Sequence, residues 1–114
     1  MEDLHCTLQI RLAKDKIFFG PGVLSLLKFT EKHESLNAAA KNMNLSYSKA
    51  SKMIKGAEKN LGFKLLDRKI GGTGGGGSTL TPECTQFLKT YEEFEYEINT
   101  LSNSLFAQLF DEYI

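Results

Sequence analysis

Residues 35–78 read SLNAAAKNMNLSYSKASKMIKGAEKNLGFKLLDRKIGGTGGGGS, and this stretch decides the fold. A short alanine-rich segment, Leu36 to Asn42, is followed by a turn and then by a lysine-rich segment, Tyr47 to Leu61. A glycine block from Gly71 to Gly77, interrupted by Thr73, closes the stretch. This order predicts two helices joined by a tight turn and followed by a flexible hairpin, which is the plan of a winged helix-turn-helix.

Serine precedes both predicted helices, and Ser35 and Ser46 are suited to N-cap them. In the first helix, apolar residues recur at i, i+3, i+4 and i+7, namely Leu36, Ala39, Ala40 and Met43. Their small size allows another helix to cross closely. The second helix carries an apolar arc on one side, formed by Ala50, Met53, Ile54, Ala57 and Leu61.

The other side of the 47–61 helix carries four lysines and no acid. A surface helix that merely uses lysine would explain this face, but a solvated face usually mixes both signs, so the pattern favours DNA. A cationic helix face can enter a major groove, where Ser48, Ser51 and Lys52 are placed to read bases. The candidate DNA-binding residues on this helix are Tyr47, Ser48, Lys49, Ser51, Lys52, Lys55 and Lys59.

The glycine block predicts the tip of a hairpin between a strand at Phe63 to Asp67 and a returning strand at Ser78 to Thr81. Glycine lets backbone amides approach phosphates without obstruction by side chains. A nucleotide-binding loop is excluded, because the Gly-Lys-Ser/Thr ending is missing, while a flexible linker stays open. The candidate DNA contacts in this wing are Lys64, Arg68, Lys69, Gly72, Gly74 and Gly75.

Charge is strongly segregated, although the 114-residue chain has a net charge of zero. Residues 41–69 hold eight basic residues against two acidic ones, whereas residues 82–114 hold one against seven. The first segment is suited to a polyanion and the second is not. Two ordinary solvated faces are the alternative.

Before the helix-turn-helix, Thr7 to Leu12 alternates apolar and polar residues and predicts a strand. Ala13 to Lys16 predicts a turn and Ile17 to Phe19 a return strand, which completes a hairpin. Proline at the first helical position then predicts a helix from Pro21 to about His33. Its buried side is expected to hold Val23, Leu24, Leu26 and Leu27.

Thr81, Pro82 and Glu83 predict the start of a last helix that extends nearly to the C-terminus. Its apolar residues follow a heptad pattern, which predicts a homodimer through a self-complementary helix face. A helix that folds back on its own domain is the alternative. The candidate dimer-interface residues are Phe87, Tyr91, Phe94, Ile98, Leu101 and Leu105.

Length and composition predict one mainly α domain with a small β component, an α+β winged helix-turn-helix at residues 1–81, with a dimerisation helix at 82–114. No run approaches the about 20 apolar residues of a membrane span, so a cytoplasmic, nucleoid-associated protein is expected. Cys6 and Cys84 lack metal-binding spacing and are expected to be buried, reduced thiols. His5 and His33 are isolated, so no metal site, catalytic residue or enzyme activity is predicted.

These motifs resemble the N-terminal DNA-binding domain of molybdate-responsive (ModE-type) transcriptional regulators. The resemblance rests on residues 38–50 (AAAKNMNLSYSKA), the glycine block at 71–77 and the Leu80-Thr81-Pro82 run, and it covers roughly residues 8–91. The helix-turn-helix is also similar to that of LysR-type regulators. The resemblance implies a dimer that binds palindromic operator DNA and controls genes for molybdate uptake and molybdoenzymes.

Three positions depart from the family pattern. The family usually has a basic residue in place of Ser48, tryptophan in place of Ser51 and lysine in place of Thr73. The molybdate-binding domains of full-length members are not present in this sequence, so a stand-alone DNA-binding protein without a cofactor is expected. A separate effector stays open, as does an alternative function as a protein-protein interaction module that keeps the fold without reading DNA.

Overall fold

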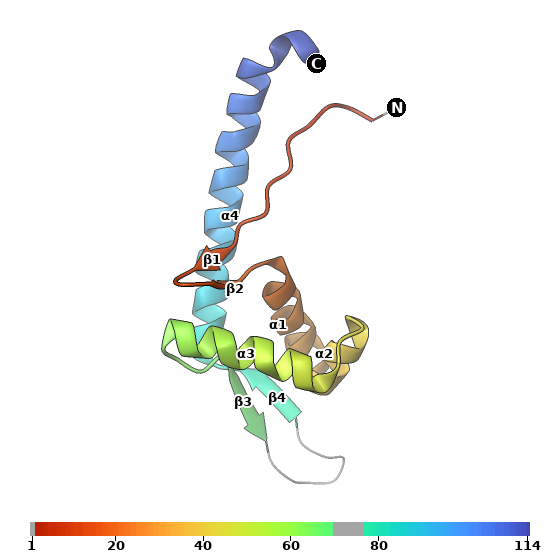
Figure 1. The fold of residues 1–114 in the computed structure, drawn as a ribbon, viewed down its shortest axis with the longest axis vertical. Coiled ribbons are helices and arrows are strands. Elements are labelled where there is room, and N and C mark those ends of the chain that lie inside the picture. The colour runs from red at the N-terminus through yellow and green to blue at the C-terminus, as the bar shows by residue number, and fades with distance from the viewer. Residues whose placement is uncertain (1, 70–76) are drawn as a thin grey trace.

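The computed structural model describes residues 2–69 and 77–114, and its elements follow the order expected for a winged helix (Figure 1). Helices α1 (Pro21–His33), α2 (Leu36–Asn42) and α3 (Tyr47–Leu61) form a three-helix unit. Strands β3 (Leu66–Lys69) and β4 (Gly77–Leu80) follow it, and the long helix α4 (Pro82–Leu109) ends at a short 3-10 turn (Asp111–Tyr113). The α+β winged-helix fold is therefore confirmed.

The predicted caps all form. The hydroxyl groups of Ser35 and Ser46 accept hydrogen bonds from the backbone N–H groups of Ala38 (3.1 Å) and Lys49 (3.0 Å). Thr81 caps α4 in the same way through the N–H of Cys84 (3.0 Å). Because each cap satisfies a backbone donor that the first helical turn leaves unpaired, it fixes the residue at which its helix begins.

The turn between α2 and α3 is held by backbone hydrogen bonds. The N–H of Leu45 donates to the carbonyl of Ala40 at 2.9 Å, and Asn44 adopts a left-handed conformation with φ of 56°. At the far end of α3, Gly62 has φ of 84° and its N–H donates to the carbonyl of Glu58 at 2.8 Å. Glycine adopts this conformation without steric cost, so Gly62 ends α3 and turns the chain into the wing.

The wing pairs antiparallel, with Leu66 opposite Leu80 and Lys69 opposite Gly77. Its base is attached to the turn after α1, where the N–H of Ser78 donates to the carbonyl of Glu34 at 3.0 Å. A Cβ atom at Gly77 would lie only 3.0 Å from that carbonyl oxygen. Close packing against the helical unit therefore favours glycine at this position, since a side chain would push against the Glu34 carbonyl.

One apolar core joins the three-helix unit to the wing and to the start of α4. It comprises Phe19, Val23, Leu26, Leu27, Leu36, Ala39, Ala40, Ala50, Ile54, Ala57, Leu65, Leu66, Cys84, Leu88 and Tyr91. The first three turns of α4 therefore pack into the same core as the domain that was predicted to end at residue 81. Beyond them α4 projects away from the domain, with the N-terminal segment running beside it (Figure 1). A 28-residue helix is about 42 Å long.

The N-terminal hairpin is shorter than predicted. Strand β1 covers only Leu12–Ala13 and pairs with β2 (Ile17–Phe19), whereas a strand over Thr7 to Leu12 was expected. Residues 7–11 have no strand partner in the described chain, because they leave the hairpin and follow α4. The hydroxyl of Tyr91 donates to the carbonyl of Ile10, and the Cys6 sulfur lies 3.5 Å from the Ser102 hydroxyl.

Candidate nucleic-acid interface

Helix α3 has one covered side and one open side. Its apolar side contacts the core through Ala50, Ile54 and Ala57, each almost fully buried. Its open side, which we term the cationic face, consists of Ser48, Lys49, Lys52, Lys55 and Lys59, all of them exposed. The structure thus brings five of the sequence-predicted site residues together on one surface.

The lysines of the cationic face are not neutralised by any side chain that the structure describes. Among those side chains, the single ion pair joins Lys28 to Glu92 at 3.1 Å, away from α3. The one acid on α3, Glu58, instead accepts hydrogen bonds from the backbone N–H groups of Leu65 (2.7 Å) and Leu66 (3.4 Å). Its carboxylate joins α3 to the start of the wing, so the cationic face is left available for an anionic partner.

Ser51 does not belong to this face. Only 8% of the residue is exposed, and its hydroxyl accepts a hydrogen bond from Nη2 of Arg68 at 3.3 Å. The prediction that Ser51 reads bases is therefore wrong. The helical position of Ser51 placed it at the boundary between the two sides, and packing of the wing covers it.

Arg68 connects the wing to the start of α3. Its Nη1 donates to the hydroxyl of Tyr47 at 2.8 Å, and its guanidinium carbon lies 5.9 Å from the centroid of that ring. Tyr47 is exposed but is held in place by this contact. An arginine has five N–H donors, so the two used here leave others for a phosphate. No spacing in the sequence indicated this contact, since 21 residues separate the partners.

The remaining wing residues divide into two groups. Lys64 is exposed at the entrance to the wing, and its carbonyl accepts a hydrogen bond from the Thr81 hydroxyl at 2.6 Å. Gly72, Gly74 and Gly75 lie outside the described residues, as does the side chain of Lys69. Their contacts with DNA stay predictions.

The candidate dimer face of α4 is smaller than predicted. Tyr91 is 3% exposed and packs edge-on against Phe19, with ring centroids 4.9 Å apart. Phe87 contacts the rings of Phe19 (5.0 Å) and Phe63 (6.0 Å). Assigning Tyr91 to the dimer interface is therefore wrong, and Phe87 packs mainly within its own domain. The heptad pattern indicated an apolar face but not which partner covers each turn.

Further along α4 the apolar face has no cover within the described chain. Phe94, Leu101 and Leu105 are 47%, 67% and 54% exposed. Ile98 is half-buried and lies one turn before Ser102, whose hydroxyl is 3.5 Å from the Cys6 sulfur. The alternative in which α4 folds back on its domain thus holds for its first turns and not for the rest.

Neither cysteine forms a disulfide. Cys84 is buried as expected, whereas Cys6 is half-exposed, so the expectation of two buried thiols is wrong for Cys6. Burial raises the pKa of Cys84 from 9.0 to about 12, and the nearby carboxylates of Glu31 and Glu58 add to the shift. A thiol with this pKa stays protonated at neutral pH and does not act as a nucleophile.

Burial also raises the pKa of the Tyr91 phenol, with a contribution from Glu95 that Arg11 opposes. Within the described parts of the chain, no three His, Cys, Asp or Glu residues gather as metal ligands. None of the helices in those parts combines the length and the hydropathy of a membrane span.

Comparison with known proteins agrees with this geometry. The transcriptional regulator ModE of Haemophilus influenzae is 34% identical over 95 residues, which cover 83% of this chain and 37% of that protein. The DNA-binding transcriptional dual regulator ModE of Escherichia coli K12 is 32% identical over 79 residues, which cover 69% and 30% respectively. The chain therefore spans about a third of the length of the curated relatives it matches, and the predicted resemblance to the ModE-type DNA-binding domain is confirmed.

Two solved structures share the fold. The DNA-binding domain of CbnR in its complex with DNA aligns with a TM-score of 0.58 and 20% identity, over 77% of this chain and 95% of that one. The DNA-binding domain of BenM in complex with benA site 1 DNA aligns with a TM-score of 0.54 and 20% identity, over 77% and 92%.

The model of bacterial regulatory helix-turn-helix proteins of the lysR family matches residues 23–85, from the first core residue of α1 to the first turn of α4. This match covers α2, α3 and the wing, the elements that form the candidate interface. The chain belongs to the lysR family of bacterial regulatory helix-turn-helix proteins.

Proposed function

We propose that this chain is a homodimeric transcriptional regulator that binds palindromic operator DNA. The observation that carries the proposal is the cationic face of α3. Its four lysines are exposed, have no acidic group within 4 Å among the described side chains, and lie on a helix fixed from behind by the core. A rigid helix with this face fits the major groove, and DNA supplies the missing counter-charge.

The residues of the cationic face divide by chemistry. Ser48 and Lys52 lie one turn apart in the N-terminal half of α3 and are the proposed base readers, since hydroxyl and ammonium groups bond to base edges. Lys49, Lys55 and Lys59 are proposed to contact phosphates, which fix the register without specifying sequence. The backbone of the glycine block is proposed to contact a phosphate or the adjacent minor groove.

The uncovered turns of α4 support the homodimer. Phe94, Leu101 and Leu105 present exposed apolar side chains about one or two turns apart, and a second copy of the same helix would cover them. The acidic residues of α4 keep this region away from the duplex. A two-fold axis through α4 would then place two α3 helices in successive major grooves, about 34 Å apart.

The likeness to ModE-type regulators supports a finer proposal, that the target genes serve molybdate transport or molybdoenzymes. The relatives extend well beyond the region matched here, so the proposal concerns the operator and not the signal. An effector would act through another domain or another protein.

Selection of genomic fragments tests the proposal. The purified protein is mixed with sheared DNA from its source, and bound fragments are sequenced with and without molybdate. We expect enrichment of fragments that share a palindrome, and loss of that preference in Lys52→Ala. Lys89→Ala, which removes one exposed charge from α4, is the matched control and should keep it. Absence of any enriched DNA would instead favour an interaction module.

A further inference from the structure

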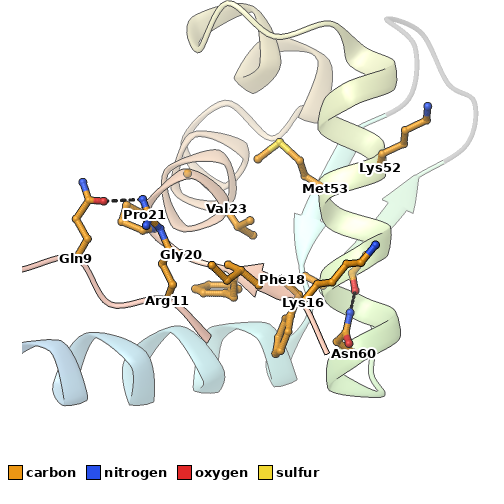
Figure 2. Close-up of a pocket in the computed structure, with 15 residues that line it drawn as sticks. Gln9, Arg11, Lys16, Phe18, Gly20, Pro21, Val23, Lys52, Met53 and Asn60 are labelled. Atoms are coloured by element: carbon orange, nitrogen blue, oxygen red, sulfur yellow. Dashed lines mark hydrogen bonds between the residues drawn. The ribbon is translucent and has the colours of Figure 1, made fainter. Parts of the chain in front are cut away.

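An open groove of about 620 Å³ lies beside α3 (Figure 2). Its walls are the β1–β2 hairpin, the start of α1 and the part of α3 between Lys52 and Asn60. The wing contacts α3 through Tyr47, Ser51 and Glu58, which point to a different side of the helix from the groove residues Met53 and Asn60. The cationic face of α3 is therefore bordered by the wing on one side and by this hairpin groove on the other.

Three basic side chains line the hairpin groove, although most of its lining is apolar. Arg11 and Lys16 contribute to its walls from the hairpin and Lys52 from α3, and all three are exposed. Figure 2 shows Lys16 extending across to α3 beside Asn60. Arg11 donates to the side-chain oxygen of Gln9 at 2.7 Å, which leaves its charge unneutralised. The acid of the hairpin turn, Asp15, does not line the groove and lies within 4 Å of none of these cations.

Gly56 leaves the surface of α3 bare at the point where the groove meets the cationic face. Glycine in a helix interior destabilises a protein relative to alanine, so it needs a reason. Packing within the described chain gives none, because a Cβ atom at Gly56 would meet no heavy atom within 4 Å. The carbonyl of Gly56 already accepts a bond from the Asn60 side chain at 2.9 Å. The missing side chain therefore leaves room for a partner outside the chain.

We propose that the hairpin groove binds the sugar-phosphate backbone of the duplex that α3 reads. Lys16 and Arg11 bond to its phosphates, and Gly56 allows the backbone to approach the helix. This inference rests on the proposed function, since the same duplex occupies both surfaces. The groove is open and continuous with the cationic face through Lys52, which fits an extended polyanion better than a small anion held in an enclosed site.

The test compares variants by fluorescence anisotropy on the palindromic duplex and on random duplex, across a range of salt concentrations. Lys16→Ala should weaken both duplexes alike by about tenfold and reduce the salt slope by about 0.9 for each phosphate that a protomer no longer neutralises. Lys14→Ala removes an equal charge from the same hairpin outside the groove, and it should change affinity less than about twofold. Equal effects of the two substitutions would overturn the inference.

Gly56 gives a second, independent readout. Gly56→Ala and Gly56→Gln should both raise the melting temperature, because both residues favour the helix over glycine. Affinity for DNA should fall in the same order as side-chain size, with Gly56→Gln the weaker binder. More stable variants that bind DNA as tightly as the parent would contradict a close approach at this residue.

Different results would contradict DNA binding as a whole and DNA binding in the groove alone. If the parent protein and Lys14→Ala bind no duplex at low salt, the proposed function is wrong and the groove proposal falls with it. If both bind and the Lys16 and Gly56 variants match them, only the groove proposal is wrong.

Discussion

Helices α3 and α4 are both amphipathic, but α3 exposes its polar side whereas α4 exposes part of its apolar side. The chain buries the centre of the apolar side of α3, at Ala50, Ile54 and Ala57, and leaves a cationic face open. It covers the apolar side of α4 only as far as Tyr91, and the charged residues beyond are all acidic. The difference separates two kinds of binding: α3 fits a polyanion, and the second half of α4 fits an apolar partner such as a copy of itself.

The largest effect is expected from disrupting the uncovered half of α4. Leu101→Asp should convert the proposed dimer to a monomer, because a carboxylate would be buried in the interface. Affinity for a palindromic duplex should then fall by about 100-fold, since the two domains no longer bind together. Sedimentation equilibrium and anisotropy measure the two effects.

Asn99→Asp is the control for this substitution. It adds the same charge on the opposite side of α4, at an exposed residue. It should leave both the dimer and the DNA affinity unchanged. A Leu101→Asp protein that stays dimeric would show that α4 does not join the protomers.

A smaller effect is expected at the contact between α3 and the wing. Arg68→Ala removes the hydrogen bonds to Tyr47 and Ser51, each worth about 1 kcal/mol, and frees the wing from the start of α3. Affinity should fall about tenfold on all duplexes, and the melting temperature should fall as well. Lys64→Ala removes one charge from the wing without breaking this contact. If the two variants lose affinity equally and Arg68→Ala melts normally, Arg68 acts through its charge alone.

The smallest effect is expected in the pH dependence of stability, through Cys84. This thiol is buried at the start of α4, near the carboxylates of Glu31 on α1 and Glu58 on α3. Because its pKa rises from 9.0 to about 12 on folding, the unfolded chain releases the thiol proton first. The contribution of the protonated thiol to the free energy of unfolding is fully present below pH 9 and is lost as the pH rises from 9 toward 12.

Urea unfolding at several alkaline pH values measures this loss. The free energy of unfolding should fall less steeply with pH in Cys84→Ala than in the parent. The difference in slope corresponds to at most about one proton released on unfolding. Cys6→Ala is the control and should follow the parent. Parallel curves for Cys84→Ala and the parent would contradict the effect of burial.

The sequence was sufficient wherever structure depends on near neighbours. Ser35, Ser46 and Thr81 cap helices because a cap bonds to an N–H three residues away. Predictions failed where a distant segment decides the outcome. Ser51 is covered by Arg68, 17 residues further along the chain. Residues 7–11 are extended toward α4 and not paired as a strand, because Tyr91 bonds to Ile10, 81 residues earlier.

The same limit applied to the candidate site. The lysine face of α3 could be predicted because helical geometry relates residue number to the direction of each side chain. The hairpin groove was missed, since Lys16 and Gly56 meet only after the hairpin packs beside α3. The alternating N-terminal residues and the unexplained helix glycine were the available signals, and neither indicates its partner.

The salt dependence of duplex binding tests most directly whether the cationic face of α3 binds DNA. Affinity for a palindromic duplex is measured by anisotropy from low to high salt, and its logarithm is plotted against the logarithm of salt concentration. Three phosphate-contacting lysines in each of two protomers predict a slope of about −5, because each neutralised phosphate releases about 0.9 counterions. A slope near zero, or no binding at low salt, would contradict this role of α3.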